Sequence, residues 1–361
     1  MKQLLITLSL IALAGYAIAA APVVSNVVAT PSAGKVTISY DLAADADCDV
    51  TLLISADNGV SYNDIPPTAV SGDIGNSVTV GTGKQIIWHP AGDGMAVGTD
   101  YKAKVIARDN PNHVAVDDFI LVEGGTFNNG TSEVTLSSFY MDKYEITQTE
   151  YQAVMGVNPS YFTGVTNGPV ERVSWFNAIE YCNRRSLQEG LTPCYSYSTY
   201  GTNPDNWPAG WNSSNTNHTN VSCNWSVDGY RLPTEMEWMF AAKGGNQSQG
   251  YTYSGSNTIG DVAWYSSNSS STTHTVGTKA ANELGTFDMS GNVWEWCWDI
   301  FGSYPSGSQN NPTGANSGSR RVRRGGSWNS NANNCSVFLR NAVNATGSSN
   351  IFGFRCVRVS P

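Results

Sequence analysis

Few side chains in this sequence have types and spacings that could do chemistry. Seven cysteines supply thiols, and their odd number leaves at least one without a partner in the same chain. The four histidines show no zinc-ligand spacing, and no glycine-rich phosphate loop or Gly-x-Ser-x-Gly turn is present. Asp288 and Glu295 stand in one glycine-containing turn, where carboxylate and carbonyl oxygens could hold calcium. Alternatively, Glu295 only accepts hydrogen bonds from backbone amides.

The composition indicates an exported, loop-rich protein. Charged residues make up only 14% of the 361 residues, and the net charge is -9 with no basic run, which argues against nucleic acid as a partner. Residues 1–19 combine a positive start, an apolar stretch and small residues, as a secretory signal peptide does. An N-terminal anchor is the alternative, but the apolar stretch is too short for a membrane span. We therefore expect a secreted, periplasmic or cell-surface protein without membrane insertion.

Two regions with different patterns must position these residues. Residues 22–112 contain short alternating apolar and polar runs separated by turn residues, which predicts an all-β sandwich of the immunoglobulin or fibronectin type. Residues 118–361 carry scattered short elements and three helices, whose N-caps we place at Thr147, Ser174 and Thr234. The predicted fold class is therefore α+β with little regular secondary structure, preceded by an all-β domain.

Six strings in the second region resemble one known family. They are Phe139-Tyr-Met-Asp-Lys-Tyr-Glu-Ile-Thr147, Pro169-Val-Glu-Arg-Val-Ser-Trp175, Gly229-Tyr-Arg-Leu-Pro-Thr-Glu-Met-Glu-Trp238, Asp288-Met-Ser-Gly-Asn-Val-Trp-Glu-Trp296, Arg324-Gly-Gly-Ser-Trp328 and Gly353-Phe-Arg355. Their order and spacing resemble the formylglycine-generating enzyme, or sulfatase-modifying factor, family. The resemblance covers about residues 118–361 and implies a variant of the C-type lectin-like fold.

The resemblance implies a copper site that is incomplete in this chain. The family's known enzymes oxidise a cysteine of a client sulfatase to formylglycine with oxygen and copper(I), which two cysteines hold. These two positions fall on Ser330 and Cys335, and Ser327 matches a pocket serine of the family. Because a hydroxyl substitutes poorly for a thiolate on Cu(I), copper is expected only if Cys297 and Cys335 form a different two-thiolate site. A structural disulfide between Cys297 and Cys335 is the alternative that export favours.

Further disulfides are expected. Cys182 and Cys356 match a structural bridge of the animal enzymes, whereas Ala242 and Arg340 occupy both ends of a second bridge that is absent here. Cysteines also flank an insertion at residues 195–222, and we expect them to close it as a local bridge. The expected pairs are therefore Cys182 with Cys356, Cys194 with Cys223 and, on the ground of export alone, Cys297 with Cys335.

Calcium is the ion that the resemblance implies. Its ligands would be the Asp288 side chain, the Gly291 and Val293 carbonyls and the Glu295 carboxylate. A second family site would use Asp261 and the Val262 carbonyl, but its downstream partners are not recognisable in this sequence.

Four functions remain open at this stage. We favour a secreted binding protein without standard formylglycine-generating activity, which recognises an unidentified protein or small-molecule ligand through the family's pocket. The first alternative is an oxygen- and copper-dependent oxidase that acts on an exported client. The second is a diversified ligand-binding surface protein, because the segment 329–352 is rich in asparagine, at Asn329, Asn331, Asn333, Asn334, Asn341, Asn344 and Asn350. An inert display module would also have this sequence.

Overall fold

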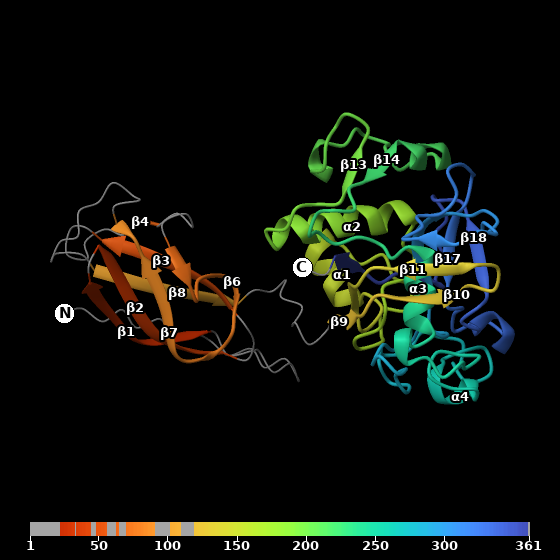
Figure 1. Cartoon of the computed structure of the whole chain (residues 1–361), viewed down its shortest axis with the longest axis horizontal. Helices are drawn as coiled ribbons and strands as arrows, with labels where there is room; N and C mark the ends of the chain where they lie inside the picture. Colours follow the sequence, from red (N-terminus) through yellow and green to blue (C-terminus); the bar gives the residue numbers. More distant parts are fainter. Residues whose placement is uncertain are drawn as a thin grey trace. The chain divides into compact units, whose positions relative to one another are not determined.

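The computed structural model describes residues 22–32, 34–44, 48–55, 63–64, 70–90, 102–109 and 119–359. The chain divides into two compact units, Met1–His113 and Val114–Pro361 (Figure 1). The predicted signal peptide lies outside the described residues. Among the residues that are described, no helix is long and apolar enough to cross a membrane.

The first unit consists of antiparallel strands in two sheets. One sheet has the order β1-β2-β7-β5, and the other has the order β4-β3-β6 with β8 paired to β3. The strands are β1 (Val23–Ser32), β2 (Lys35–Ala43), β3 (Cys48–Ser55), β4 (Asn63–Asp64), β5 (Val70–Gly72), β6 (Gly75–Val78), β7 (Gly81–Trp88) and β8 (Lys102–Asp109). Alternate residues of β2 and β3, such as Ile38 and Leu52, are buried in one apolar cluster that both sheets share. The immunoglobulin- or fibronectin-like assignment of this unit stays a prediction.

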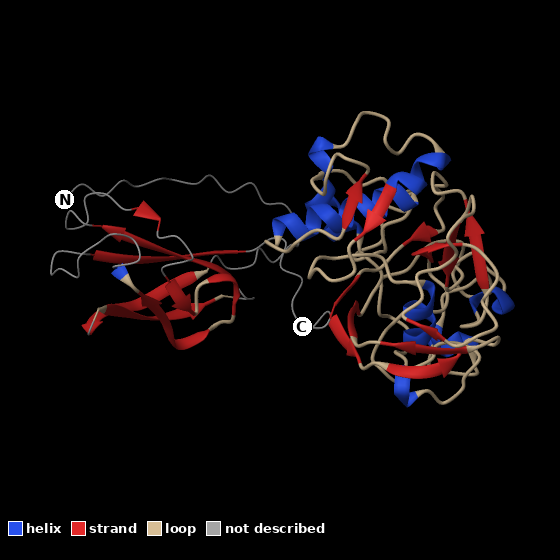
Figure 2. Ribbon diagram, turned by 45° about the horizontal axis from the view of Figure 1, so that its top comes forward, coloured by secondary structure: helices blue, strands red, loops and turns tan. Residues whose placement is uncertain are grey.

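The second unit mixes many short strands with few helices and much loop (Figure 2). Its strands are β9 (Phe119–Val122), β10 (Gly125–Asn128), β11 (Glu133–Leu136), β12 (Phe139–Asp142), β13 (Tyr195–Tyr197), β14 (Val221–Cys223), β15 (Trp294–Ile300), β16 (Gln309–Asn310), β17 (Arg321–Arg324), β18 (Arg340–Val343), β19 (Phe352–Gly353) and β20 (Val357–Val359). Its α-helices are α1 (Gln148–Met155), α2 (Trp175–Gln188), α3 (Glu235–Ala242) and α4 (Ile259–Val262).

Three of these helices begin where the sequence predicts them. Thr147, Ser174 and Thr234 each accept a hydrogen bond from the backbone N–H three residues later, and the residue there bonds back to the cap, so all three are capping boxes. α1 ends at Gly156, whose φ of 75° suits a glycine in the left-handed region. The predicted helix starts are confirmed. They could be predicted because a helix cap depends on residues that are close together in the sequence.

A four-stranded sheet with the order β18-β17-β15-β19 separates two apolar cores. The core on one side includes α2 and buries Trp175 and Trp296, and the core on the other side includes α3 and buries Trp238 and Cys297. Trp296 donates its indole N–H to the Val173 carbonyl at 3.0 Å, which ties β15 to the start of α2. The loop that leaves β17 at residue 325 therefore starts from a rigid frame.

Candidate functional site

The loop after β17 brings together the residues of the predicted copper position. Ser330 accepts a hydrogen bond from the Ser327 backbone N–H at 3.0 Å, and the two hydroxyl oxygens lie 3.2 Å apart. The Ser330 backbone N–H donates to the Ser327 carbonyl at 2.9 Å, which closes a tight turn. Ser327, Ser330 and Cys335 are all buried. The serine at position 330 is therefore part of the turn's own hydrogen bonding.

The Cys335 thiol lies against the same turn. A Cβ placed on Gly326 would lie 2.7 Å from the Cys335 sulfur, so the thiol packs directly on this glycine. Burial raises the pKa of Cys335 to about 12, although a hydrogen bond from the Ser327 backbone acts in the opposite direction. The Ser330 hydroxyl and the Cys335 thiol thus share Ser327 as a neighbour, and the thiol is protonated at neutral pH.

Cys297 has different neighbours from Cys335. It lies on β15 in the core beside α3, where burial, then Asp299 and Glu235, raise the pKa of its thiol. The structure holds both cysteines as thiols. Either pairing of Cys297 with Cys335, by copper or by a disulfide, stays a prediction.

The other expected cysteine pairs lie close together as thiols. The sulfurs of Cys182 on α2 and Cys356 before β20 are 3.7 Å apart. Cys194 and Cys223 share a hydrogen bond at the end of the β13–β14 hairpin, which lowers the pKa of Cys194. Both arrangements place sulfurs within reach of bond formation, and the disulfides themselves stay predictions.

The predicted calcium turn is built around an arginine. Arg355 binds both carboxylate oxygens of Glu295, at 2.7 and 2.8 Å, and Trp238 donates its indole N–H to the same carboxylate at 2.8 Å. Glu295 and Arg355 are fully buried. The structure therefore bonds Glu295 to three protein donors, and its role as a calcium ligand stays a prediction.

Two other carboxylates surround the same arginine. The Asp288 carboxylate accepts a bond from the Gly277 N–H at 2.7 Å, while its second oxygen is buried without a hydrogen-bond partner in the described region. Burial raises the pKa of Asp288 to about 6. Glu145, which sequence reasoning missed, accepts bonds from the Val293 N–H and the Asn292 amide, and its pKa is raised by burial, then by Asp288 and Glu295.

The ligands predicted for the two calcium sites lie on different elements. Gly291 and Val293 belong to the same turn as Asp288, whereas Asp261 and Val262 lie on α4. Asp261 accepts a hydrogen bond from Ser256 at 3.2 Å. Within the part of the chain that the structure describes, no three acidic, histidine or cysteine side chains are placed to hold a metal ion. Calcium binding stays a prediction, which melting with and without a chelator tests.

An aromatic strip, formed by Tyr161, Phe162 and Trp328, lies beside the Ser327 turn. The Phe162 ring meets Trp328 edge-to-face at a centroid distance of 5.4 Å and meets Tyr161 at 4.9 Å. The Arg172 guanidinium lies 5.0 Å from the Tyr161 ring centroid. Tyr161 is 58% exposed, and Phe162 and Trp328 are half-buried. The strip therefore offers aromatic surface to a partner.

Buried polar contacts hold the aromatic strip in place. The Glu171 carboxylate accepts hydrogen bonds from the backbone N–H groups of Tyr161 and Phe162, and Glu171 is fully buried. Burial raises the pKa of Glu171. Trp328 donates its indole N–H to the Asn350 carbonyl at 2.9 Å. The sequence carries no signal for this strip, because its parts come from distant segments.

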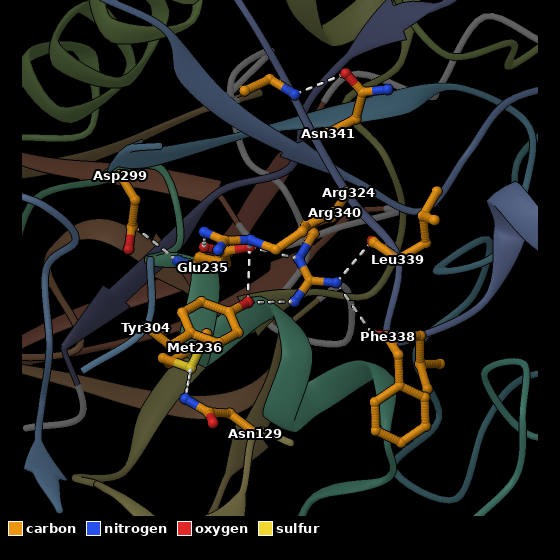
Figure 3. Close-up of polar contacts among 12 residues, drawn as sticks. Asn129, Glu235, Met236, Asp299, Tyr304, Arg324, Phe338, Leu339, Arg340 and Asn341 are labelled. Atoms are coloured by element: carbon orange, nitrogen blue, oxygen red, sulfur yellow. Dashed lines mark hydrogen bonds and ion pairs between the residues drawn. The ribbon is translucent and has the colours of Figure 1, made fainter. Parts of the chain in front are cut away.

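A second polar cluster joins α3 to the C-terminal segment (Figure 3). Glu235 is paired with Arg340 and with Arg324, at 3.0 Å for the Arg324 Nε, and it accepts the Tyr304 hydroxyl hydrogen at 3.0 Å. The Glu235 backbone N–H donates to Asp299 at 2.8 Å. Burial, and then the charge of Glu235, raise the pKa of Asp299 to about 8. Glu235, Asp299, Tyr304 and Arg340 line a pocket of about 90 Å³, but both carboxylate oxygens of Glu235 are already bonded.

Short strands, few helices and a buried Ser327 turn define a C-type lectin-like domain of the sulfatase-modifying type. The profile of the family described as "Sulfatase-modifying factor enzyme 1-like domain" matches residues 104–360, and the chain belongs to this family. The match begins within β8 and covers the second unit as far as residue 360.

Several known proteins are similar to this chain. "Chaperone protein LppX" of Paenibacillus barcinonensis is 42% identical over 269 residues, which are 68% of this chain and 91% of that protein. Mouse "Formylglycine-generating enzyme" is 25% identical over 68% of this chain and 76% of that enzyme. Among solved structures, "Treponema denticola variable protein 1" matches with a TM-score of 0.60 and 35% identity over 67% of this chain and 94% of that one.

Proposed function

We propose that this protein is an exported binding module whose second unit recognises a partner protein through the aromatic strip. The strip carries the proposal, because an exposed tyrosine is backed by two further rings and anchored by a buried carboxylate. Tyrosine and tryptophan provide large contact areas at low entropic cost, and serine and asparagine adapt their hydrogen bonds. Exposed Asn329, Asn331 and Ser348 lie on segments that adjoin the strip.

The buried turn supports binding over oxidation. Copper(I) needs thiolates, yet position 330 carries a hydroxyl that is bonded within its own turn. The one cysteine beside it, Cys335, has a pKa of about 12 and stays protonated at neutral pH. The oxidase alternative therefore rests on the similarity to formylglycine-generating enzymes and not on the side chains at these two positions. A chaperone among the similar proteins is in keeping with a protein partner.

Site-specific photo-crosslinking tests this proposal. A benzoylphenylalanine replaces Tyr161 in the full chain, which is produced and exported in its native host. Tyr200, which is 48% exposed on the 195–222 insertion, is the matched control position. We expect a discrete adduct of one protein at position 161, competed by unlabelled wild-type protein, and none at position 200. Equal adducts at both positions, or none at position 161, would refute the strip as the contact surface.

Diversified binding is a second candidate function with its own observation. All seven asparagines of the segment 329–352 are at least partly exposed: Asn329, Asn331, Asn333 and Asn344 are exposed, and the other three are half-buried. A segment whose polar residues face outward can vary without disturbing the core. Sequencing this gene from many single cells tests the idea. Variation concentrated at these codons would support it, and a uniform segment would contradict it.

Export itself is part of the proposal. The signal peptide at residues 1–19 and the spacing role of the first unit both follow from the sequence alone. N-terminal sequencing of the mature protein tests the first, with a start near residue 20 expected. A mature protein that keeps Met1 would contradict secretion by this route.

A further inference from the structure

A separate pocket in the second unit lies between the start of α3 and the C-terminal end of β11. This Trp225 pocket has a volume of about 330 Å³ and is lined by Ser137, Trp225, Arg231, Thr234, Glu237 and Thr313, among others. None of its lining residues belongs to the aromatic strip or to the Ser327 turn. Its volume lies at the lower end of the ~300–1,000 Å³ usual for small-molecule sites, which suits a ligand of one or two rings.

The wall of the Trp225 pocket contains two opposite charges that neutralise each other. Arg231 and Glu237 form a two-point ion pair, with both N···O distances at 2.7 Å. Both residues are more than nine-tenths buried. Glu237 also accepts the Thr234 backbone N–H at 2.8 Å, so its carboxylate is held by three donors. An anionic ligand would be repelled by Glu237 and a cationic ligand by Arg231. Either ligand would have to break the Arg231–Glu237 ion pair to gain a charged partner. The pocket therefore selects a neutral ligand.

The rim of the pocket offers unused hydrogen-bond donors. Ser137 and Thr234 accept hydrogen bonds through their hydroxyl oxygens, from the Asn311 amide and the Glu237 backbone N–H. No acceptor for either hydroxyl hydrogen is found among the described residues. The buried Arg231 Nε likewise has no hydrogen-bond partner there. Ser137 is exposed at the rim, whereas Thr234 and Arg231 are buried. Buried donors usually have a partner, which a ligand or an ordered water supplies.

One aromatic ring and a fixed loop complete the pocket. The half-buried Trp225 indole stands over the Arg231 guanidinium, whose centre lies 5.1 Å from the ring centroid. The loop that contains Thr313 is held at the end of β11, because the Asn311 side-chain oxygen accepts a hydrogen bond from the Ser137 backbone N–H at 2.8 Å. The donors and the ring therefore keep fixed positions relative to one another.

We propose that the Trp225 pocket binds a neutral saccharide of one or two rings. Each sugar hydroxyl both donates and accepts, so it can satisfy the Ser137 and Thr234 hydroxyls and a buried guanidinium N–H together. The carbon-bound hydrogens of a sugar ring pack against an indole, while the neutral ring leaves the Arg231–Glu237 pair intact. This site is independent of the aromatic strip, so the protein would hold a glycan and a partner protein at different places.

Saturation-transfer NMR on the full chain tests the proposal. The probes are glucose, galactose and N-acetylglucosamine with cellobiose, lactose and diacetylchitobiose, because ligands of this size bind in the millimolar range. Thr313→Trp fills the pocket from its exposed rim. Thr219→Trp, at an exposed threonine outside the pocket, is the matched control. Near-ultraviolet circular dichroism and the melting temperature show that each variant is folded.

We expect saturable transfer from at least one sugar, a tenfold or greater loss of affinity in folded Thr313→Trp, and no change in Thr219→Trp. Tyr161→Ala should leave sugar binding unchanged, which separates this site from the proposed protein partner. The proposal is overturned if no sugar of the panel gives saturable transfer. It is also overturned if sugar binding persists unchanged in the filled pocket.

Discussion

Ser330→Cys is the change that most directly tests what the serine does. The Ser330 hydroxyl lies 3.0 Å from the Ser327 nitrogen, and the same backbone N–H serves the Cys335 thiol. A cysteine at position 330 would therefore place a second sulfur beside the Ser327 backbone N–H, which already contacts the Cys335 sulfur. Two thiolates are the ligand set that Cu(I) prefers.

The magnitude follows from the pKa of Cys335. Its rise from 9.0 to about 12 makes the thiolate roughly 1,000-fold rarer than for an exposed cysteine, or about 4 kcal/mol at ~1.36 kcal/mol per pKa unit. A single buried thiol that carries this penalty competes poorly for copper. With a second sulfur at position 330, both thiolates can bind one Cu(I) ion. The positive charge of the ion then offsets the free-energy cost of burying the two thiolates. Affinity should also rise with pH, because copper binding releases thiol protons.

Anaerobic competition with a chromophoric Cu(I) chelator between pH 7 and 9 measures this gain. Wild-type protein should leave the chelator complex intact, and Ser330→Cys should take up one equivalent, more tightly at higher pH. Ser266→Cys is the control, because Ser266 is exposed and its backbone N–H bonds the Ser330 carbonyl at 2.9 Å. Tight binding by the wild type would refute the claim that position 330 breaks the site. Equal binding by both cysteine variants would refute the shared position.

Three further experiments test the residues that support the site. Arg340→Met removes two bonds to Glu235 and one to the Gly302 carbonyl, and we expect a loss of about 2 kcal/mol, or roughly 4–8 °C in the calorimetric melting temperature, with Arg320→Met as an exposed control. Asp299 holds its proton more tightly when folded, so stability falls as pH rises from its usual 3.8 to about 8; Asp299→Asn should flatten urea-measured stability over that window, and an unchanged slope would contradict the raised pKa. For the Cys182–Cys356 pair, mass spectrometry of unreduced protein should find the linked peptides, and free thiols at both positions would remove the predicted bridge.

Local sequence signals predicted the helices well. Thr147, Ser174 and Thr234 mark helix starts because a capping box needs only four consecutive residues. The family resemblance likewise assigned Ser327, Ser330 and Cys335 to one short segment, and in the structure Ser327 and Ser330 form a turn against which Cys335 packs. Spacing along the chain was sufficient wherever the partners were neighbours in sequence.

Contacts between distant segments were not predictable in this way. The two hydrogen bonds that Arg355 donates to Glu295 join segments about 60 residues apart, and no local signal predicted them. A carboxylate in a glycine turn has the same sequence signature whether a cation or an arginine meets it. The aromatic strip was missed for a related reason, because Phe162 and Trp328 become neighbours only when the 158–172 and 327–331 loops fold together.

An ionic contact links α3 to the C-terminal segment near the position where the family resemblance would imply a second disulfide. Arg340, at one end of the missing bridge, instead pairs with Glu235 in the first turn of α3. A disulfide stabilises mainly by restricting the unfolded chain, whereas an ion pair acts only in the folded state. The buried Glu235 carboxylate is bonded at both oxygens by Arg340 and by the Tyr304 hydroxyl, and the Arg324 guanidinium pairs with it as an ion. Because this link needs no oxidation, reducing agents should leave it intact while they open any disulfide elsewhere in the unit.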